Sequence, residues 1–259
     1  MTTLLIILAS LTAVGAAARS TWSPCGLSML STITPMAERT RGRRFGLTAF
    51  WFVLGAVAGG ATLGLIAAAG AALFGLLSLS IGVSLGIAAV LALGAAAMDL
   101  GIGTQMPHHR RQVDEVWLDQ YRSWVYGLGF GWQIGTGLAT YIMTAAVYLT
   151  VALAALTANP AVAFGICVLF GLTRGLALFL GVRLTNPERL RSFHRWFDEL
   201  GPTVRRAVIG VQMAVAVVAG SAAWGPSGAV AMVILVVALG VVTRASFTRS
   251  TSETVLADA

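Results

Sequence analysis

The sequence contains no lysine, only ten acidic residues and only two cysteines. Charged residues make up 10% of it, against 57% hydrophobic residues and a mean hydropathy of +0.84. This composition excludes a disulfide-stapled secreted domain, and with several apolar runs of about 20 residues it predicts an all-α polytopic membrane protein in contact with a lipid bilayer. The formal charge of +7 belongs to arginines in loops beside that bilayer, so it requires no nucleic acid as a partner.

Interruptions of the apolar runs predict seven membrane spans. The first (residues 2–36) and the fourth (residues 123–158) are over-long and broken, at residues 19–24 and 132–137. The other five are Phe45–Phe74, Leu76–Met98, Ala161–Val182, Ala207–Trp224 and Ala229–Val242. No acidic residue lies inside any predicted span. The segment from Pro187 to Phe197 is typical of an amphipathic helix at the membrane surface, with aromatic anchors and basic contacts to anionic lipid.

The arginines gather after the odd-numbered spans, and the connections after the second, fourth and sixth spans contain none. By the positive-inside rule, the N-terminus then lies outside and the C-terminus in the cytoplasm of a bacterial cytoplasmic membrane. The arginines concerned are Arg39, Arg41, Arg43, Arg44, Arg110, Arg111, Arg122, Arg183, Arg189, Arg191, Arg195, Arg205, Arg206, Arg244 and Arg249.

An alternative interpretation of the N-terminus is a cleaved signal peptide. Leu4 to Leu11 would form its apolar core and Gly15 to Ala18 its small-residue stretch. The lack of a basic segment before the apolar core, and the apolar run that resumes after Pro24, favour a membrane span instead.

Spans one to three and four to six form two units of opposite orientation, because each contains an odd number of crossings. We therefore expect two inverted three-helix repeats with broken first helices, plus one extra C-terminal helix. The corresponding segments are residues 1–98 (first repeat), 99–122 (cytoplasmic loop), 123–224 (second repeat), 225–243 (extra helix) and 244–259 (cytoplasmic tail). Spacings of four residues, Gly55 to Gly59 and Gly60 to Gly64, predict close helix packing.

Several motifs resemble the CcdA/DsbD transmembrane family. They are the Ser23-Pro24-Cys25 break, the arginine-rich loop after it, Phe52-Val-Leu-Gly-Ala, and Gly129-Phe-Gly-Trp132. The resemblance covers residues 1–224. It implies a membrane carrier of reducing equivalents for cytochrome c biogenesis or envelope thiol handling, on a LysE-like transporter scaffold, with a thioredoxin-like or other thiol protein as partner and no cofactor.

In that family, both broken helices carry a Pro-Cys pair, and the two cysteines form one redox-active disulfide. The first pair is present here as Pro24 and Cys25. Alignment on Trp132 and Gly137 puts Ile134 and Gly135 where the second pair would stand, so the partner thiol is missing.

Cys25 is the candidate reactive thiol. Pro24 removes a backbone donor and leaves carbonyl groups open toward a cavity, and a thiol at the N-terminus of the restarted helix is more reactive. Cys167, on the fifth span, is the only substitute for the missing partner. The alternatives are a packing cysteine beside a simple kink at Cys25, and a small buried apolar residue at Cys167.

Polar residues in the fourth span suggest a second kind of site. Thr136, Thr140 and Thr144 recur every four residues, so we expect them to share one helical face with Gln133 close to it, beside Gly135 at the break. This stripe can line a path for a polar solute. Alternatively, the hydroxyls bond to their own or neighbouring helices.

Arg174 is the only charge well inside a predicted span. A buried guanidinium costs several kcal/mol unless it finds carbonyl groups, water or an anion, so we expect it to face carbonyls freed at the helix breaks or to bind an anionic substrate. The alternative is a side chain that reaches toward the cytoplasmic surface.

Two function classes follow, and neither is a conventional enzyme. The first is a thiol carrier of the CcdA/DsbD kind, with Cys25 resolved by Cys167 or by a cysteine of a partner. The second is a small-solute or ion transporter on the same repeats, which has lost the redox pair. A third interpretation is an assembly factor that holds a partner in the membrane. No metal site is expected, because the adjacent pair His108 and His109 has no further ligands nearby.

Overall fold

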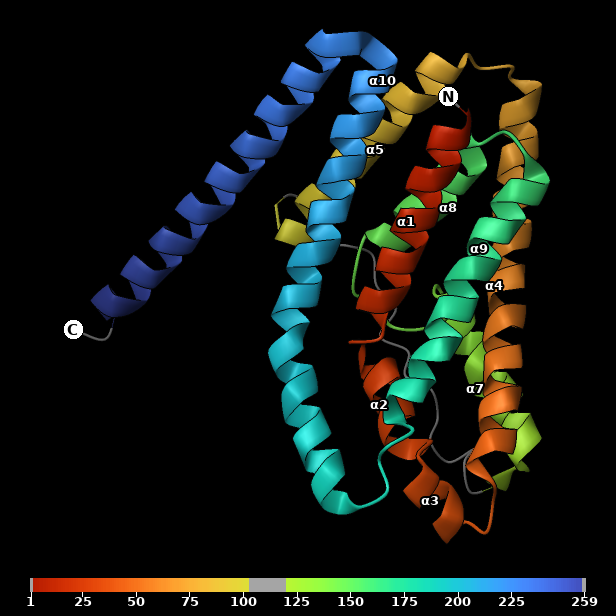
Figure 1. The fold of residues 1–259 in the computed structure, drawn as a ribbon. Coiled ribbons are helices and arrows are strands. Elements are labelled where there is room, and N and C mark those ends of the chain that lie inside the picture. Colours follow the sequence, from red (N-terminus) through yellow and green to blue (C-terminus); the bar gives the residue numbers. More distant parts are fainter. Residues whose placement is uncertain (1, 103–119, 258–259) are drawn as a thin grey trace.

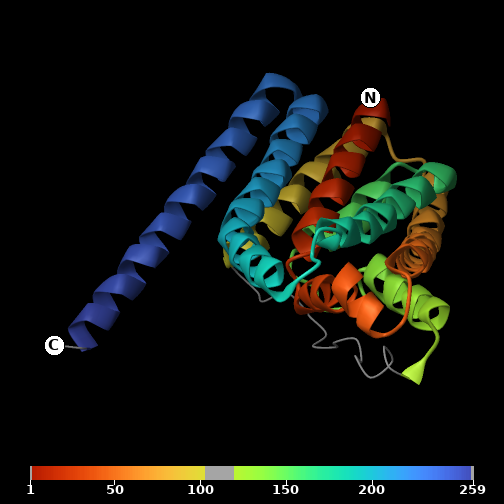
Figure 2. The same cartoon turned by 60° about the horizontal axis from the view of Figure 1, so that its bottom comes forward.

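The computed structural model describes residues 2–102 and 120–257, with side chains up to residue 241. The regular structure in these ranges is entirely helical (Figure 1). The helices form one bundle, from which the C-terminal part of α10 (Pro187–Ala257) stands apart (Figure 2). His108, His109 and most of the predicted loop 99–122 lie outside the described residues.

The first half contains five helices, and side-chain caps begin three of them. Ser23, Thr34 and Ser80 each accept a hydrogen bond from the backbone N–H three residues later. Prolines follow the first two caps at the first helical position, where a missing N–H is harmless. The helices are α1 (Thr2–Ser20), α2 (Pro24–Thr32), α3 (Pro35–Thr40), α4 (Phe45–Leu76) and α5 (Ile81–Leu100).

The second half begins with two short helices and ends with one long one. The elements are α7 (Ser123–Thr136), α8 (Ala146–Leu156), α9 (Pro160–Leu176), the 3-10 helix η1 (Ala177–Gly181) and α10. α10 departs from helical geometry at Gly225, where φ is 68° and ψ is −154° directly before Pro226. It therefore consists of two arms joined at a bend.

Within the described residues, five helices are long and apolar enough to cross a bilayer, judged by length and composition: Thr2–Ser20, Phe45–Leu76, Ile81–Leu100, Pro160–Gly181 and Pro187–Val241. This confirms an all-α, multi-span membrane protein. The count differs from the seven predicted spans in two places. The fourth span is divided into α7 and α8, of 14 and 11 residues, each shorter than the roughly 20 residues of a full crossing. The sixth and seventh spans are the two arms of α10.

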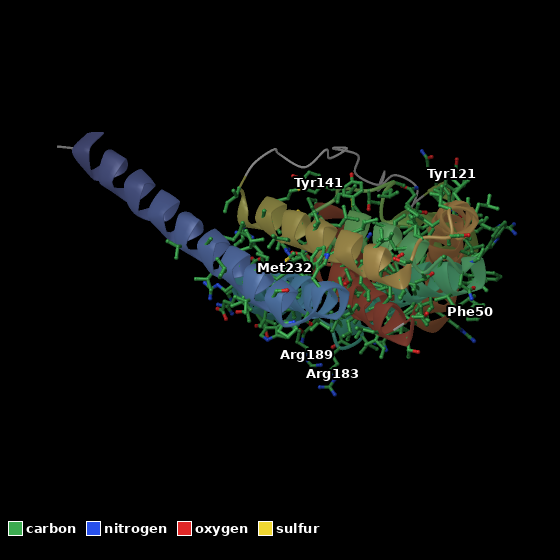
Figure 3. All side chains as sticks on the ribbon, turned by 90° about the horizontal axis from the view of Figure 1, so that it is seen from above. Phe50, Tyr121, Tyr141, Arg183, Arg189 and Met232 are labelled. Atoms are coloured by element: carbon green, nitrogen blue, oxygen red, sulfur yellow. The ribbon has the colours of Figure 1, made fainter. Side chains whose placement is uncertain are left out.

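The segment from Pro187 to Phe197 is helical, as predicted, and its place at a membrane surface stays a prediction. That segment is the start of α10, which continues through Pro202. Its apolar face packs on the first helix break, because the Trp22 ring stacks on Phe197 at 4.3 Å and donates from Nε1 to the Phe197 carbonyl at 2.7 Å. Arg189, by contrast, points away from the bundle at its edge (Figure 3).

Glycines bring α4 into backbone contact with α7 and α9, as their spacing predicts (Figure 1). A Cβ added at Gly55 would lie 2.3 Å from the Leu128 carbonyl oxygen, and one added at Gly60 would lie 2.7 Å from that of Cys167. Any side chain at either position would force the helices apart. Both α7 and α9 are therefore packed directly against the backbone of α4.

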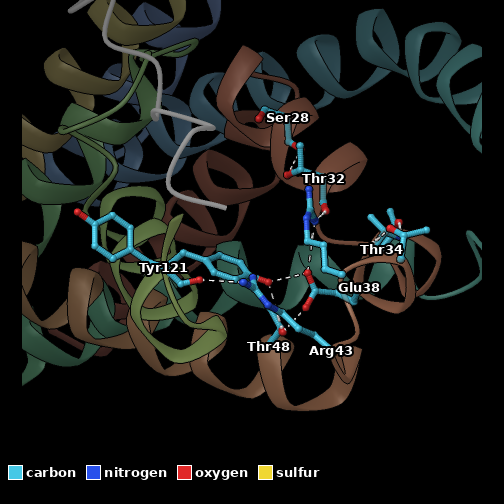
Figure 4. A network of polar contacts seen from close by, with 11 residues as sticks. Ser28, Thr32, Thr34, Glu38, Arg43, Thr48 and Tyr121 are labelled. Carbon is cyan, nitrogen blue, oxygen red and sulfur yellow. Dashed lines mark hydrogen bonds and ion pairs between the residues drawn. The ribbon is translucent and has the colours of Figure 1, made fainter. Parts of the chain in front are cut away.

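A buried carboxylate joins the ends of three helices (Figure 4). Glu38 of α3 is fully buried, accepts from the Tyr126 hydroxyl of α7 at 2.6 Å and from the Thr48 hydroxyl of α4, and forms an ion pair with Arg41 at 3.5 Å. Arg43 lies over the Tyr126 ring, with 5.2 Å between the guanidinium carbon and the ring centroid. Because each carboxylate oxygen has a partner, the charge is tolerated at this position.

Candidate functional site

The first helix break separates α1 from α2 at residues 21–23. A tight turn crosses it, with the N–H of Ser23 donating to the Ser20 carbonyl at 3.1 Å. Ser23 then caps α2 through its hydroxyl, and Pro24 takes the first helical position. Cys25 follows in the first turn, so it lies at the N-terminus of α2 as the sequence predicts. A helix N-terminus favours negative charge.

The second helix break is longer than predicted. α7 ends at Thr136, Gly137 adopts a left-handed conformation with φ 71°, and the chain returns to α-helix only at Ala146. The break therefore covers residues 137–145 rather than 132–137. Glycine suits this turn, since a side chain at positive φ is strained.

The expectation that the threonines share one helical face is wrong, because two of the three lie in the second break. Thr136 ends α7 and donates to the Trp132 carbonyl of its own helix at 2.8 Å. Thr140 is 1% exposed, and its hydroxyl has no partner within the described residues. Thr144 donates to Asp99. Gln133 is only partly buried on α7. A solute path along these residues stays a prediction.

Arg174 connects the two breaks. Its side chain is buried, with Nη1 donating to the Ile134 carbonyl at 2.7 Å and Nη2 to the Ser20 carbonyl at 3.2 Å. Ser20 ends α1 and Ile134 lies in the last turn of α7, so the guanidinium occupies the point where two helix C-termini meet. Both termini carry partial negative charge and suit a cation. Phe170, one turn earlier on α9, has its ring centroid 5.9 Å from the guanidinium carbon.

The two cysteines lie in different surroundings; both are buried, and they form no disulfide with each other. Cys25 is near enough to Arg174 for an electrostatic interaction between the thiol and the guanidinium. Cys167 belongs to the large apolar cluster of the bundle, and its carbonyl lies against Gly60 of α4. Cys25 thus lies at a helix N-terminus near a guanidinium, whereas Cys167 is surrounded by apolar side chains.

Alignment on Trp132 and Gly137 puts Gly135 where the CcdA/DsbD family has its second cysteine. This glycine is enclosed by the α4 backbone. A Cβ added there would lie 2.0 Å from the carbonyl oxygen of Ala56. Gly131 and Gly171 meet the same stretch of α4, with added Cβ atoms 2.1 Å from the Phe52 oxygen and 2.4 Å from the Ala56 oxygen. The missing cysteine therefore reflects a helix contact that has no room for any side chain.

Asp99 is a polar residue that the sequence analysis missed. Its carboxylate accepts from the Thr144 hydroxyl, from the Ala145 N–H at 2.7 Å and from the Gln212 amide at 2.8 Å, while Arg205 donates to its backbone carbonyl at 2.7 Å. It lies within α5, so the prediction that no acidic residue belongs to a span is wrong. Its position at the end of an apolar run was the available signal.

Metal ligands are not gathered anywhere in the part of the chain that the structure describes. No group of three or more histidine, cysteine, aspartate or glutamate side chains lies close enough together to hold an ion. The buried polar atoms without a partner in these ranges are the Thr140 hydroxyl, Arg174 Nε and Gln212 Oε1.

We predict that Gly135→Cys, which would restore the family's second cysteine, destabilises the protein. The new side chain would overlap the Ala56 carbonyl, and overpacking of this kind costs about 1–3 kcal/mol. Thermal unfolding of the purified protein in detergent measures the effect. Gly165→Cys on α9 is the matched control, because a Cβ there meets nothing within 4 Å. Equal melting temperatures for the two variants would contradict the close packing at Gly135.

We predict that Arg174→Met leaves the fold largely intact but slows alkylation of Cys25 about tenfold. The carbonyls of Ser20 and Ile134 each keep a turn hydrogen bond from Ser23 and Gly137, and an apolar side chain of similar volume often replaces a buried charge at little cost. A thiol reacts with maleimide through its thiolate, and a neighbouring positive charge generally promotes that reaction, so its removal should slow the labelling.

The rate of maleimide labelling at matched folding yield measures this effect. Arg183→Met is the control, because this arginine is exposed and points away from the bundle (Figure 3). An unchanged Cys25 labelling rate in Arg174→Met would refute the electrostatic contact.

No protein-family model and no solved structure matches this chain. It is similar, however, to proteins named methylamine utilization protein MauF. The MauF of Paracoccus versutus is 30% identical over 197 residues, which cover 73% of this chain and 68% of that protein. Those of Paracoccus denitrificans and Methylobacillus flagellatus are 34% and 35% identical over 61% of this chain, and the matches span only 57% and 56% of their lengths. The chain thus belongs to the MauF family and is a multi-span membrane protein.

Proposed function

We propose that this protein is a membrane thiol carrier of the CcdA/DsbD kind, in which Cys25 exchanges disulfides with cysteines of partner proteins. The observation that carries the proposal is the position of Cys25. It combines the N-terminus of α2 with nearness to the buried guanidinium of Arg174. The nucleophile in disulfide exchange is a thiolate, and reactive cysteines in proteins occur at helix N-termini and beside cationic groups.

A single carrier thiol has a defined reaction sequence. The Cys25 thiolate attacks a disulfide of an oxidised partner, which forms a mixed disulfide and releases one partner thiolate. A thiolate of a second, reduced partner then attacks the Cys25 sulfur and frees the first partner with both thiols reduced. The other thiol of the second partner closes its own disulfide and regenerates Cys25. Two electrons pass between the partners, and no internal disulfide is needed.

Cys167 is the weaker candidate for a resolving thiol. It lies in the apolar cluster on α9, while Cys25 begins α2 beside the first break. The absent side chain at Gly135 removes the other internal option. We therefore propose that the second cysteine comes from a thioredoxin-like or other thiol protein.

The second candidate function is transport of a small solute or ion through the two breaks. Two buried polar groups without a partner among the described residues favour it: the Thr140 hydroxyl in the second break and Arg174 Nε between the breaks. In this alternative, Cys25 is a packing residue, and Arg174 with Thr140 contacts the solute.

We also propose the inverted-repeat organisation, with residues 1–98 and 123–224 as the two units and 225–243 as an additional helix. Its support is that a helix break begins each unit and that one arginine contacts both breaks. The distribution of arginines supports an N-terminus outside the cytoplasmic membrane and a tail, residues 244–259, inside it.

Thiol trapping in intact cells tests the carrier function. Cells are treated with a maleimide mass tag with and without prior reduction, in wild type, Cys25→Ser and Cys167→Ser. We expect a reducible adduct with a partner protein in wild type and in Cys167→Ser, but none in Cys25→Ser. A Cys25–Cys167 disulfide would instead identify Cys167 as the resolving thiol. Two permanently reduced cysteines, with Cys25→Ser fully functional, would refute the thiol carrier and leave the transporter.

Reporter fusions test the orientation. Alkaline phosphatase is active only outside the cytoplasm and green fluorescent protein only inside it. A fusion after Arg249 should fluoresce, and one in the connection after α4, at Ser78, should show phosphatase activity. The reverse pattern would invert the proposed topology while leaving the fold unchanged.

A further inference from the structure

A cavity of about 400 Å³ lies beside the first break, between three segments that are distant in sequence. α2 and the turn before it contribute Trp22 and Pro24, the second break contributes Tyr141 and Met143, and the first arm of α10 contributes Phe197. Pro24 is exposed, although its neighbour Cys25 is buried. The volume is within the usual range for small-molecule sites.

The lining of this cavity has a single charge. Asp198 of α10 contributes a carboxylate, and no arginine or histidine lines the cavity. Asp198 makes no hydrogen bond or ion pair with any residue inside the described ranges, and Arg195, one turn earlier, lies beyond ion-pair distance. The Asp198 side chain is exposed, so a cation can reach its carboxylate from solvent.

The walls are aromatic. Trp22 and Phe197 are held in a parallel stack with 5° between their planes, and a hydrogen bond from the indole to the α10 backbone fixes Trp22 in place. Tyr141, which is labelled in Figure 3, lines the cavity from the second break. Aromatic rings attract cations through their quadrupole, and a thioether such as that of Met143 is soft and polarizable.

We propose that this cavity binds a small organic ammonium ion. Aromatic walls with one carboxylate suit a cation that is apolar on its outside, because the rings contact its alkyl groups and the carboxylate supplies the opposite charge. A bare metal ion would lack ligands here, and an anion would be repelled. The site is independent of the proposed thiol chemistry, since Cys25 does not line it.

A comparison of choline with its neutral isostere 3,3-dimethyl-1-butanol distinguishes two effects: recognition of the positive charge, and filling of the cavity by an apolar group of the same shape. Binding of radiolabelled choline to the purified full chain in detergent is measured by scintillation proximity, with competition by the isostere, by methylammonium and by potassium. We expect a dissociation constant of the order of 1 mM, the strength of a few partly exposed cation contacts. Methylammonium should compete, whereas the isostere and potassium should not.

Asp198→Asn and Tyr141→Leu should each weaken choline binding, the first by about tenfold. Glu199→Gln is the matched control, because the adjacent carboxylate is also exposed but does not line the cavity. Unchanged thermal unfolding of the variants verifies that they fold. Choline binding that is absent, equally displaced by the isostere, or equally weakened by Glu199→Gln would overturn the proposal, whatever the thiol experiments give.

Discussion

The contact on which the centre of this molecule depends is the one between Arg174 and the ends of two broken helices. A guanidinium inside a membrane bundle is tolerated only if it has partners, and here no carboxylate supplies them. The carbonyls of Ser20 and Ile134 do so, because α1 and α7 both stop short and present their negative ends to α9. The breaks therefore explain the buried arginine: the carbonyl groups at the two helix ends make its charge tolerable at this position.

The same geometry makes the two breaks chemically different. The first restarts at once as α2, so Cys25 lies at a positive helix end and beside a positive charge. The second opens into an irregular segment, and the preceding helix is locked on α4 through Gly131 and Gly135, where backbone meets backbone. A thiol at the second break would need space that the α4 contact has taken. The asymmetry of the motif is thus an asymmetry of packing.

The sequence predicted the features that depend on local chemistry. The break at Pro24 is a serine cap followed by proline, the apolar runs exceed the length of soluble helices, and the spacing of Gly55 and Gly60 permits close contact. The sequence-based prediction failed where contacts between distant parts of the chain determine the local structure. Thr140 and Thr144 have helical spacing, yet Gly137 ends the helix and Asp99 holds Thr144 and the start of α8 from another part of the chain. Periodicity cannot reveal a partner 45 residues away.

Asp99 and Glu38 show how charge is used outside the centre. Each is surrounded by donors from other helices, so each fixes a junction: Glu38 joins α3, α4 and α7, and Asp99 joins α5, α8 and α10. Both helices that flank the second break are therefore anchored by a carboxylate, α7 through Tyr126 and α8 through its N-terminus. The first break has no such anchor: it is held by Arg174 and by the stack of Trp22 on Phe197. A rearrangement that exposes Cys25 to a partner would therefore have to release a hydrogen bond from a charged group, a ring stack and an indole hydrogen bond.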